Sequence, residues 1–199
     1  MNSPIIEWAF AEQPLPGETE SGDRCVVQVA NDRATIAVID GLGHGSEAAL
    51  AAKAAVEILE SYPNEGILPL FRLCHARLQA TRGAAMTVAR YDASAQQIEW
   101  LGAGNVRAIL LSATPEGTAE YRDMLVYSGA VGVRLPTVEV LELHVHHGDV
   151  LVLATDGIQG AFADDLRHGE YPKSQAERLL ASYRNQTDDA LILVVRIVR

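Results

Sequence analysis

The sequence predicts an α+β fold in which two antiparallel sheets pack face to face, with helices on their outer faces. Three observations support this. Strand-like patterns fill most of the chain, two adjacent helical patterns interrupt them early, and one helical pattern precedes a closing apolar strand. With 199 residues, 48% of them apolar, the chain is long enough to bury a hydrophobic core. No repeat or linker divides it, so we expect residues 1–199 to form one domain.

The first part of the chain predicts a strand followed by a hairpin. Residues 5–11 form the first strand, and residues 13–22 form a loop rich in Pro, Gly and Glu. Residues 24–30 and 33–39 are β-rich and are separated only by Asn31-Asp32, two residue types that tolerate positive φ. A two-residue hairpin turn is therefore expected here.

This hairpin would bring two acids together. If Ala30 faces Arg33, the register places Asp23 opposite Asp40. Directly opposed residues have Cβ atoms about 4.5–5.5 Å apart. Two carboxylates at that separation repel each other unless a cation lies between them.

Three helices are expected. The first covers residues 46–61, with Ser46 as its N-cap and a small apolar face suited to close packing on a sheet. The second covers 67–81, where His75 is expected to be a surface or half-buried residue rather than a ligand. The third covers 173–183. The remaining strands are expected at residues 85–91, 96–101, 106–111, 122–127, 138–146, 150–154 and 190–198.

Two apolar strands end in the same dipeptide, Asp40-Gly41 and Asp156-Gly157, where glycine lets another part of the backbone come close. The closing strand is preceded by Asp188-Asp189. Because neighbouring strand residues point to opposite faces, only one of these two acids can face a shared site. Acids at strand ends are often no more than solvated turn residues. Four such positions together favour carboxylates that converge on a hard cation.

Composition excludes several functions. The net charge of −10 leaves no basic face for a nucleic-acid backbone. We find no run of about 18 apolar residues, so no transmembrane helix is expected. The N-terminus also lacks the basic region of a signal peptide, so secretion is not expected. Cys25 and Cys74 lack metal-ligand spacing; a reduced pair in a cytoplasmic protein is expected, with a disulfide as the alternative.

Six motifs now carry a family resemblance. They are SGD (21–23), DGLGHG (40–45), RGAAMTVARYD (82–92), GAGN (102–105), ATDGI (154–158) and DDALILVVRI (188–197). Together they resemble the PPM-type, metal-dependent serine/threonine protein phosphatases, and more narrowly the bacterial SpoIIE-like branch. The motifs occur in family order over nearly the whole chain. The resemblance implies an αββα sandwich with two Mn²⁺ or Mg²⁺ ions.

The resemblance also implies a role for each acid. Asp40 would bridge the two ions. Asp156 and Asp188 would complete one metal site, and Asp23 with the backbone carbonyl of Gly41 would complete the other. Asp40 and Asp156 would be catalytic through a metal-activated water, so that no side-chain nucleophile is needed. Neither cysteine lies in a phosphate-binding loop.

The chain also departs from the family pattern. Leu42 stands where eukaryotic members have a histidine, and His44 follows two residues later. Glu18 and Glu20 occupy the region of a phosphate-binding arginine. Gly160 replaces an acid, so a third metal is not expected. The general acid therefore stays open between water and His44, and the metals are expected to bind the phosphate unaided.

The length and the DGLGHG form are most similar to the stand-alone phosphatase of the stressosome stress-response pathway. This implies phosphorylated STAS-domain proteins as partners, and we expect a monomer. The alternatives are a binding module with a phosphatase fold, and a hydrolase of small phosphoesters. His144, His146 and His147 suit a metal by spacing, but the solvent face of a hairpin explains all three.

Overall fold

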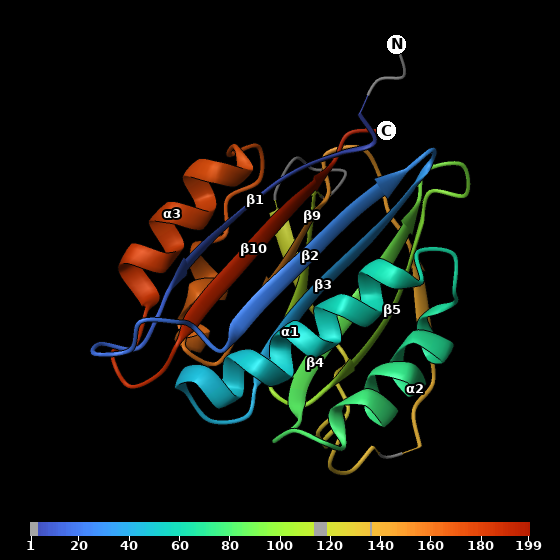
Figure 1. Ribbon diagram of the computed structural model, residues 1–199. Coiled ribbons are helices and arrows are strands. Elements are labelled where there is room, and N and C mark those ends of the chain that lie inside the picture. The colour runs from blue at the N-terminus through green and yellow to red at the C-terminus, as the bar shows by residue number, and fades with distance from the viewer. Residues whose placement is uncertain (1–3, 114–118, 136) are drawn as a thin grey trace.

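The computed structural model describes residues 4–113, 119–135 and 137–199. Two five-stranded sheets pack face to face, and helices cover the outer face of each (Figure 1). All pairings between the named strands are antiparallel. The predicted fold class is confirmed.

The first sheet has α1 (Gly45–Ser61) and α2 (Ile67–Leu78) on its outer face. Its strands, in spatial order, are β2 (Asp23–Ala30), β3 (Arg33–Gly41), β4 (Ala84–Asp92), β5 (Gln97–Ala103) and β8 (Leu141–His144).

The second sheet has α3 (Pro172–Tyr183) and a short 3₁₀ helix, η1 (Gly160–Asp165), on its outer face. Its strands, in spatial order, are β1 (Ile6–Gln13), β10 (Ala190–Ile197), β9 (Val150–Ala154), β6 (Arg107–Ala113) and β7 (Ala119–Met124).

Apolar side chains form three layers. One lies between the sheets, one beneath α1 and α2, and one beneath α3. The buried face of α1 consists mainly of alanines, which let the helix lie close to the sheet. This matches the small apolar face that the sequence predicts. No helix in the described residues is long and apolar enough to cross a membrane.

The predicted hairpin is confirmed. Ala30 pairs with Arg33, and Asn31 has a positive φ of 55°. The register continues to the end of the strands, where Asp23 pairs with Asp40. The two strands are slightly longer than predicted and include these acids.

The ends of the first two helices differ from the prediction. Ser46 is not the N-cap of α1; His44 holds that position, without a side-chain capping bond. The helix starts one residue earlier because Gly43 and Gly45, both with positive φ, turn the chain sharply. Helix α2 ends at Leu78 rather than at residue 81, since the Thr81 hydroxyl donates to the Leu78 carbonyl.

Two predicted strands are shorter or displaced. The strand expected at 122–127 is β7, and the one expected at 138–146 is reduced to β8. The segment between them has tertiary partners instead. Val138 and Val140 pack against the layer beneath α1 and α2, and Tyr127 exchanges backbone hydrogen bonds with Gly102 and Gly104. Alternation alone did not reveal this, nor did it reveal η1.

Candidate metal centre

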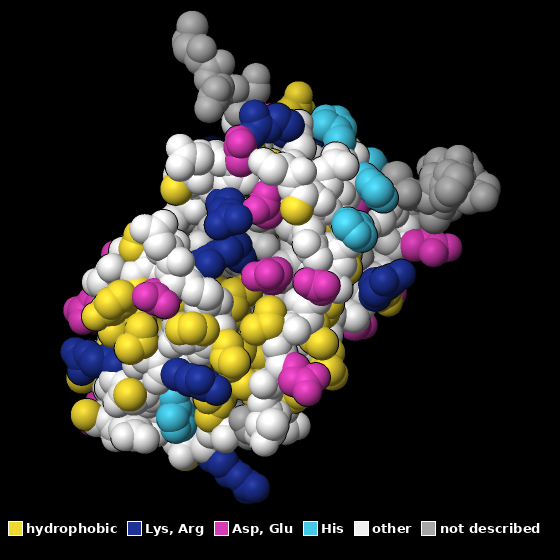
Figure 2. Space-filling model, turned by 90° about the vertical axis from the view of Figure 1, so that its right-hand side faces the viewer, with side chains coloured by type: hydrophobic (Ala, Val, Ile, Leu, Met, Phe, Trp, Pro, Cys, Tyr) yellow, Lys and Arg dark blue, Asp and Glu magenta, His cyan; other side chains and the backbone are white. Residues whose placement is uncertain are grey.

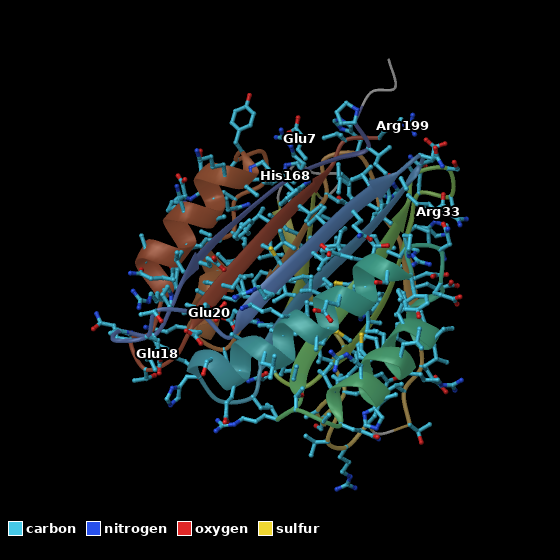
Figure 3. The ribbon with its side chains drawn as sticks, in the orientation of Figure 1. Glu7, Glu18, Glu20, Arg33, His168 and Arg199 are labelled. Atoms are coloured by element: carbon cyan, nitrogen blue, oxygen red, sulfur yellow. The ribbon has the colours of Figure 1, made fainter. Side chains whose placement is uncertain are left out.

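The four acid-bearing segments meet at the end of the sandwich where α1 begins. Strand β3 runs from Arg33 at one end to Asp40 at the other. Strand β9 ends beside the start of β10, because Ala154 pairs with Ile192. Figure 3 shows Glu18 and Glu20 at this end of the molecule, while Glu7, Arg33, His168 and Arg199 lie toward the other.

Asp23 and Asp40 form the buried part of the cluster. Asp23 is only 2% exposed, and its Oδ2 accepts a hydrogen bond from Thr155 Oγ1 at 2.8 Å. Burial, followed by repulsion from Asp40, raises the pKa of Asp23 to about 8. Burial, followed by repulsion from Asp156 and Asp188, raises the pKa of Asp40 to about 7. Placing these carboxylates together therefore opposes their ionisation.

Asp156 and Asp188 lie closer to solvent. Asp156 is exposed and accepts a hydrogen bond from Asn105 Nδ2 at 2.6 Å. Asn105 also opposes the rise in the pKa of Asp40, so its amide lies between two of the acids. Burial and the nearby Asp156 raise the pKa of Asp188.

Asp189 has a different role from its neighbour. It is buried, and its carboxylate accepts backbone hydrogen bonds from Leu15 N at 2.8 Å and Gly22 N at 2.7 Å. Asp189 thereby joins the β1–β2 loop to the start of β10. Asp188, which is half-buried, is left as the acid of this pair that is available to the cluster.

Both Asp-Gly pairs bring backbone segments very close. A Cβ added at Gly41 would lie 2.1 Å from the Ala48 carbonyl oxygen. A Cβ at Gly157 would lie 1.9 Å from the Asp189 carbonyl oxygen. Neither separation is possible for a real side chain, so each glycine is required by the approach of another element.

The residues suit divalent cations in donor chemistry and in charge. Carboxylate and carbonyl oxygens are the ligands that Mg²⁺ and Mn²⁺ prefer. Within residues 4–113, 119–135 and 137–199, no Arg or Lys forms an ion pair with Asp23, Asp40, Asp156 or Asp188. The repulsion that contributes to the raised pKa values of Asp23, Asp40 and Asp188 is therefore left for a cation to relieve.

The carboxylates are not, however, already arranged as a metal cage. In the described part of the chain, no three His, Cys, Asp or Glu side chains are placed to hold an ion together. Asp23 is directed to Thr155, and Asp156 to Asn105. Metal binding would use the second oxygen of each carboxylate, while Thr155 and Asn105 keep the first in place.

Thr155 and Asn105 are site residues that the sequence did not predict. Each belongs to a motif that was recognised, ATDGI and GAGN, but no role was assigned to it. Thr155 also accepts a hydrogen bond from Leu191 N at 2.9 Å, so it connects Asp23 to β10. In the sequence, Thr155 is visible as the neighbour of Asp156, and Asn105 as a residue that follows a strand. These positions do not reveal which acid each side chain binds.

The histidines behave mostly as expected. His44 lies at the start of α1, with its Nδ1 2.9 Å from Glu18 Oε1. His75 is half-buried on α2, and its Nδ1 accepts a hydrogen bond from Gly132 N. His144, His146 and His147 are all exposed, and Figure 2 shows histidine side chains gathered on the surface.

The cysteines offer no nucleophile. Cys25 and Cys74 are separate free thiols, so the alternative disulfide does not form. Burial raises the pKa of both thiols to about 12. Neither would be ionised near neutral pH, and a thiolate is the nucleophilic form.

Comparison with known proteins identifies the family. The family model for stage II sporulation protein E (SpoIIE) matches residues 30–198. The chain belongs to the SpoIIE family. This SpoIIE-family chain is also 27% identical over 142 residues to the phosphoserine phosphatase RsbX of Bacillus subtilis (strain 168), covering 71% of this chain and 69% of that protein.

Solved structures agree with this assignment. A chain solved in connection with the bacterial stressosome, a modular system adapted to control secondary messenger signalling, has a TM-score of 0.86 and 28% identity. The match covers 96% of this chain and 99% of that one. RsbX in complex with magnesium has a TM-score of 0.84 and 22% identity, covering 99% and 98%. The predicted resemblance to the SpoIIE-like phosphatases is confirmed, with RsbX as a similar protein, and so is the predicted enzyme class, a serine/threonine protein phosphatase.

Proposed function

We propose that this SpoIIE-family domain removes phosphate from serine or threonine residues of STAS-domain proteins in a stressosome. The observation that carries the proposal is the convergence of four carboxylates from both sheets at one end of this fold. The similar protein RsbX is a phosphoserine phosphatase, and another similar chain comes from stressosome work. Dephosphorylation would reset the stress signal.

We further propose how the acids share two ions, Mn²⁺ or Mg²⁺. Asp40 would contact both ions, Asp156 and Asp188 would complete one site, and Asp23 with the Gly41 carbonyl would complete the other. The magnesium complex of RsbX supports a divalent ion in this fold. Two such ions supply an activated water and neutralise charge on the phosphoryl oxygens.

The protein's own residues hold these ligands in place. Thr155 donates to Asp23, and Asn105 donates to Asp156, so each carboxylate keeps one oxygen in a fixed direction. Gly41 and Gly157 let α1 and the start of β10 approach the acids. The thiols are too weakly acidic to compete as nucleophiles. The reaction is therefore expected to proceed without a covalent enzyme intermediate.

The acidic surface favours recognition of a folded substrate. With a net charge of −10, the protein should repel a bare phosphopeptide, which is itself negatively charged. A folded partner can compensate by docking beside the site, for which the turn and helices after Asp40 are available. We also propose that residues 1–199 act as a single phosphatase domain, as a monomer in the cytoplasm.

The test compares two substrates. Phosphate release is measured with Mn²⁺, using a phosphorylated STAS-domain protein and a peptide of the same local sequence. We expect kcat/KM to be at least about tenfold higher on the folded protein, which corresponds to about 1.4 kcal/mol of transition-state binding. Asp40→Asn should be folded and inactive.

Other results of this experiment would contradict particular parts of the proposed function. Equal rates on protein and peptide would remove the docking argument. Activity confined to small phosphoesters would favour a metabolite hydrolase. No Mn²⁺-dependent release from any substrate would favour a binding module, and full activity of Asp40→Asn would contradict the metal assignment.

A further inference from the structure

The basic residues near the carboxylate end of the molecule differ in how firmly they are held by their present partners, and therefore in whether they are free to bind a substrate phosphate. Glu18 and Glu20, which occupy the region of the family's arginine, bind basic groups themselves. Glu18 contacts His44 at 2.9 Å, and Glu20 contacts Lys53 at 2.6 Å. These glutamates therefore hold His44 and Lys53 beside the site.

Two arginines beside the acids are already fully engaged. Arg24 donates to the carbonyls of Ser21 and Asp23 and to Glu20. Arg107 donates twice to Asp123 and once to the Gly160 carbonyl, and its guanidinium lies 5.4 Å from the centre of the Phe162 ring. Moving either arginine to a ligand would break several hydrogen bonds.

Arg82 is held differently. Its guanidinium lies over the turn that follows Asp40, since a Cβ at Gly43 would be 2.7 Å from Arg82 Nη1. A backbone hydrogen bond of 3.0 Å from Leu42 N to the Gly83 carbonyl joins the two turns. The side-chain partner of Arg82 is Glu47, and these side chains are 53% and 64% exposed. Exposed ion pairs of this kind contribute little, so Arg82 can exchange its partner at small cost.

A cavity next to this turn has room for a phosphorylated side chain. It has a volume of about 350 Å³ and is lined by Leu42, Ala85, Gly104, Asn105, Ser128 and Gly129. Ala85 is the strand partner of Asp40, and Asn105 donates to Asp156, so the cavity lies beside the acids. Leu42 lies on the cavity wall and is followed directly by Gly43, over which Arg82 is placed.

We propose that Arg82 binds the phosphoryl group of the substrate, leaving Glu47 for the phosphate when substrate enters. A guanidinium can donate two parallel hydrogen bonds to a phosphate, and a dianion is a stronger partner than one exposed carboxylate. Glu18 and Glu20 stand where the family has a phosphate-binding arginine. Arg82, which lies just before β4, would supply a guanidinium in its place. This inference rests on the proposed phosphatase function.

Binding of inorganic phosphate to the manganese-loaded protein, measured by calorimetry, tests the proposal without requiring turnover. Arg82→Ala should weaken phosphate binding at least about tenfold, which is about 1.4 kcal/mol, and Arg82→Lys should recover part of it. Glu47→Gln should strengthen binding because the competing carboxylate is gone. Manganese affinity and Tm should be unchanged in all three variants.

Arg77→Ala is the matched control, because Arg77 also forms an exposed ion pair with a glutamate of α1, Glu57. With p-nitrophenyl phosphate as substrate, Arg82→Ala should raise KM more than it lowers kcat. Unchanged phosphate affinity in Arg82→Ala, an equal loss in Arg77→Ala, or no phosphate binding by the wild type would overturn the proposal. A wild type that binds phosphate but never turns over would instead contradict the phosphatase function.

Discussion

At the scale of single residues, two adjacent acids have opposite tasks. Asp189 accepts hydrogen bonds from two backbone amides and closes the β1–β2 loop against β10. Asp188 accepts a hydrogen bond from the Asp189 amide and stays near Asp156. The first is a structural residue, and the second is the expected metal ligand.

Alanine substitutions should separate these two roles. Asp189→Ala leaves the buried Gly22 N and the partly buried Leu15 N without their acceptor, and a buried amide without a partner costs about 1–3 kcal/mol. In a protein of this size, roughly 1 kcal/mol lowers Tm by about 2–4 °C. Asp188→Ala should keep or raise Tm while weakening Mn²⁺ binding. Thermal unfolding and calorimetry test this, and the reverse pattern would show that Asp189 is the ligand.

At the scale of elements, the glycine of each Asp-Gly pair allows a second element to reach the site. Helix α1 approaches Gly41, and the start of β10 approaches Gly157. Each of these backbone contacts positions the acids of one sheet, and Asp189, which accepts a hydrogen bond from Gly22 N, links the two sheets. Thr155 adds a side-chain link from β9 to Asp23 on β2.

Gly157→Ala should therefore damage both stability and the site. Its methyl group would displace the Asp188-Asp189 segment, and overpacking of this kind costs about 1–3 kcal/mol. We expect a lower Tm and a weaker affinity for Mn²⁺. Gly160→Ala is the control, because a Cβ added at Gly160 would lie 3.5 Å from the nearest neighbouring atom, Arg107 Nη1, which is an ordinary van der Waals contact. Equal behaviour of the two variants would contradict the close-approach argument.

At the scale of the whole molecule, the carboxylate cluster links stability to pH and to metal. Asp23 and Asp40 have pKa values of about 8 and about 7 in the folded protein, well above the ordinary 3.8. Between pH 4 and pH 8 the metal-free folded protein therefore holds protons that the unfolded chain releases. Its stability is highest at low pH in this window and falls as pH rises.

The metal-free protein should accordingly show a lower Tm at pH 8.5 than at pH 5, and saturating Mn²⁺ should restore it. A loss of about 2 kcal/mol would appear as roughly 4–8 °C. Asp40→Asn should flatten this dependence, because one raised pKa is removed and the repulsion on Asp23 is relieved. A metal-free Tm that rises toward pH 8.5 would show that the carboxylates are not clustered as described.

Features that depend on interactions between residues close in sequence were predictable, and features that depend on contacts between distant segments were not. The hairpin at Asn31 and the pairing of Asp23 with Asp40 were predictable, because a two-residue turn determines the register of both strands. The alternation of apolar residues likewise predicted two sheets. The segment between β7 and β8 was not predictable, since Tyr127 and Val138 take their places from contacts distant in sequence.

The sequence by itself thus determined the acids, their strand ends and one of their pairings. Tertiary structure alone decided that Asp189 supports the β1–β2 loop, that Thr155 and Asn105 hold the carboxylates, and that Arg82 lies over Gly43. Local backbone rules act across a turn or along a strand. Contacts between sheets depend on how elements far apart in the chain pack, and no local pattern encodes that packing.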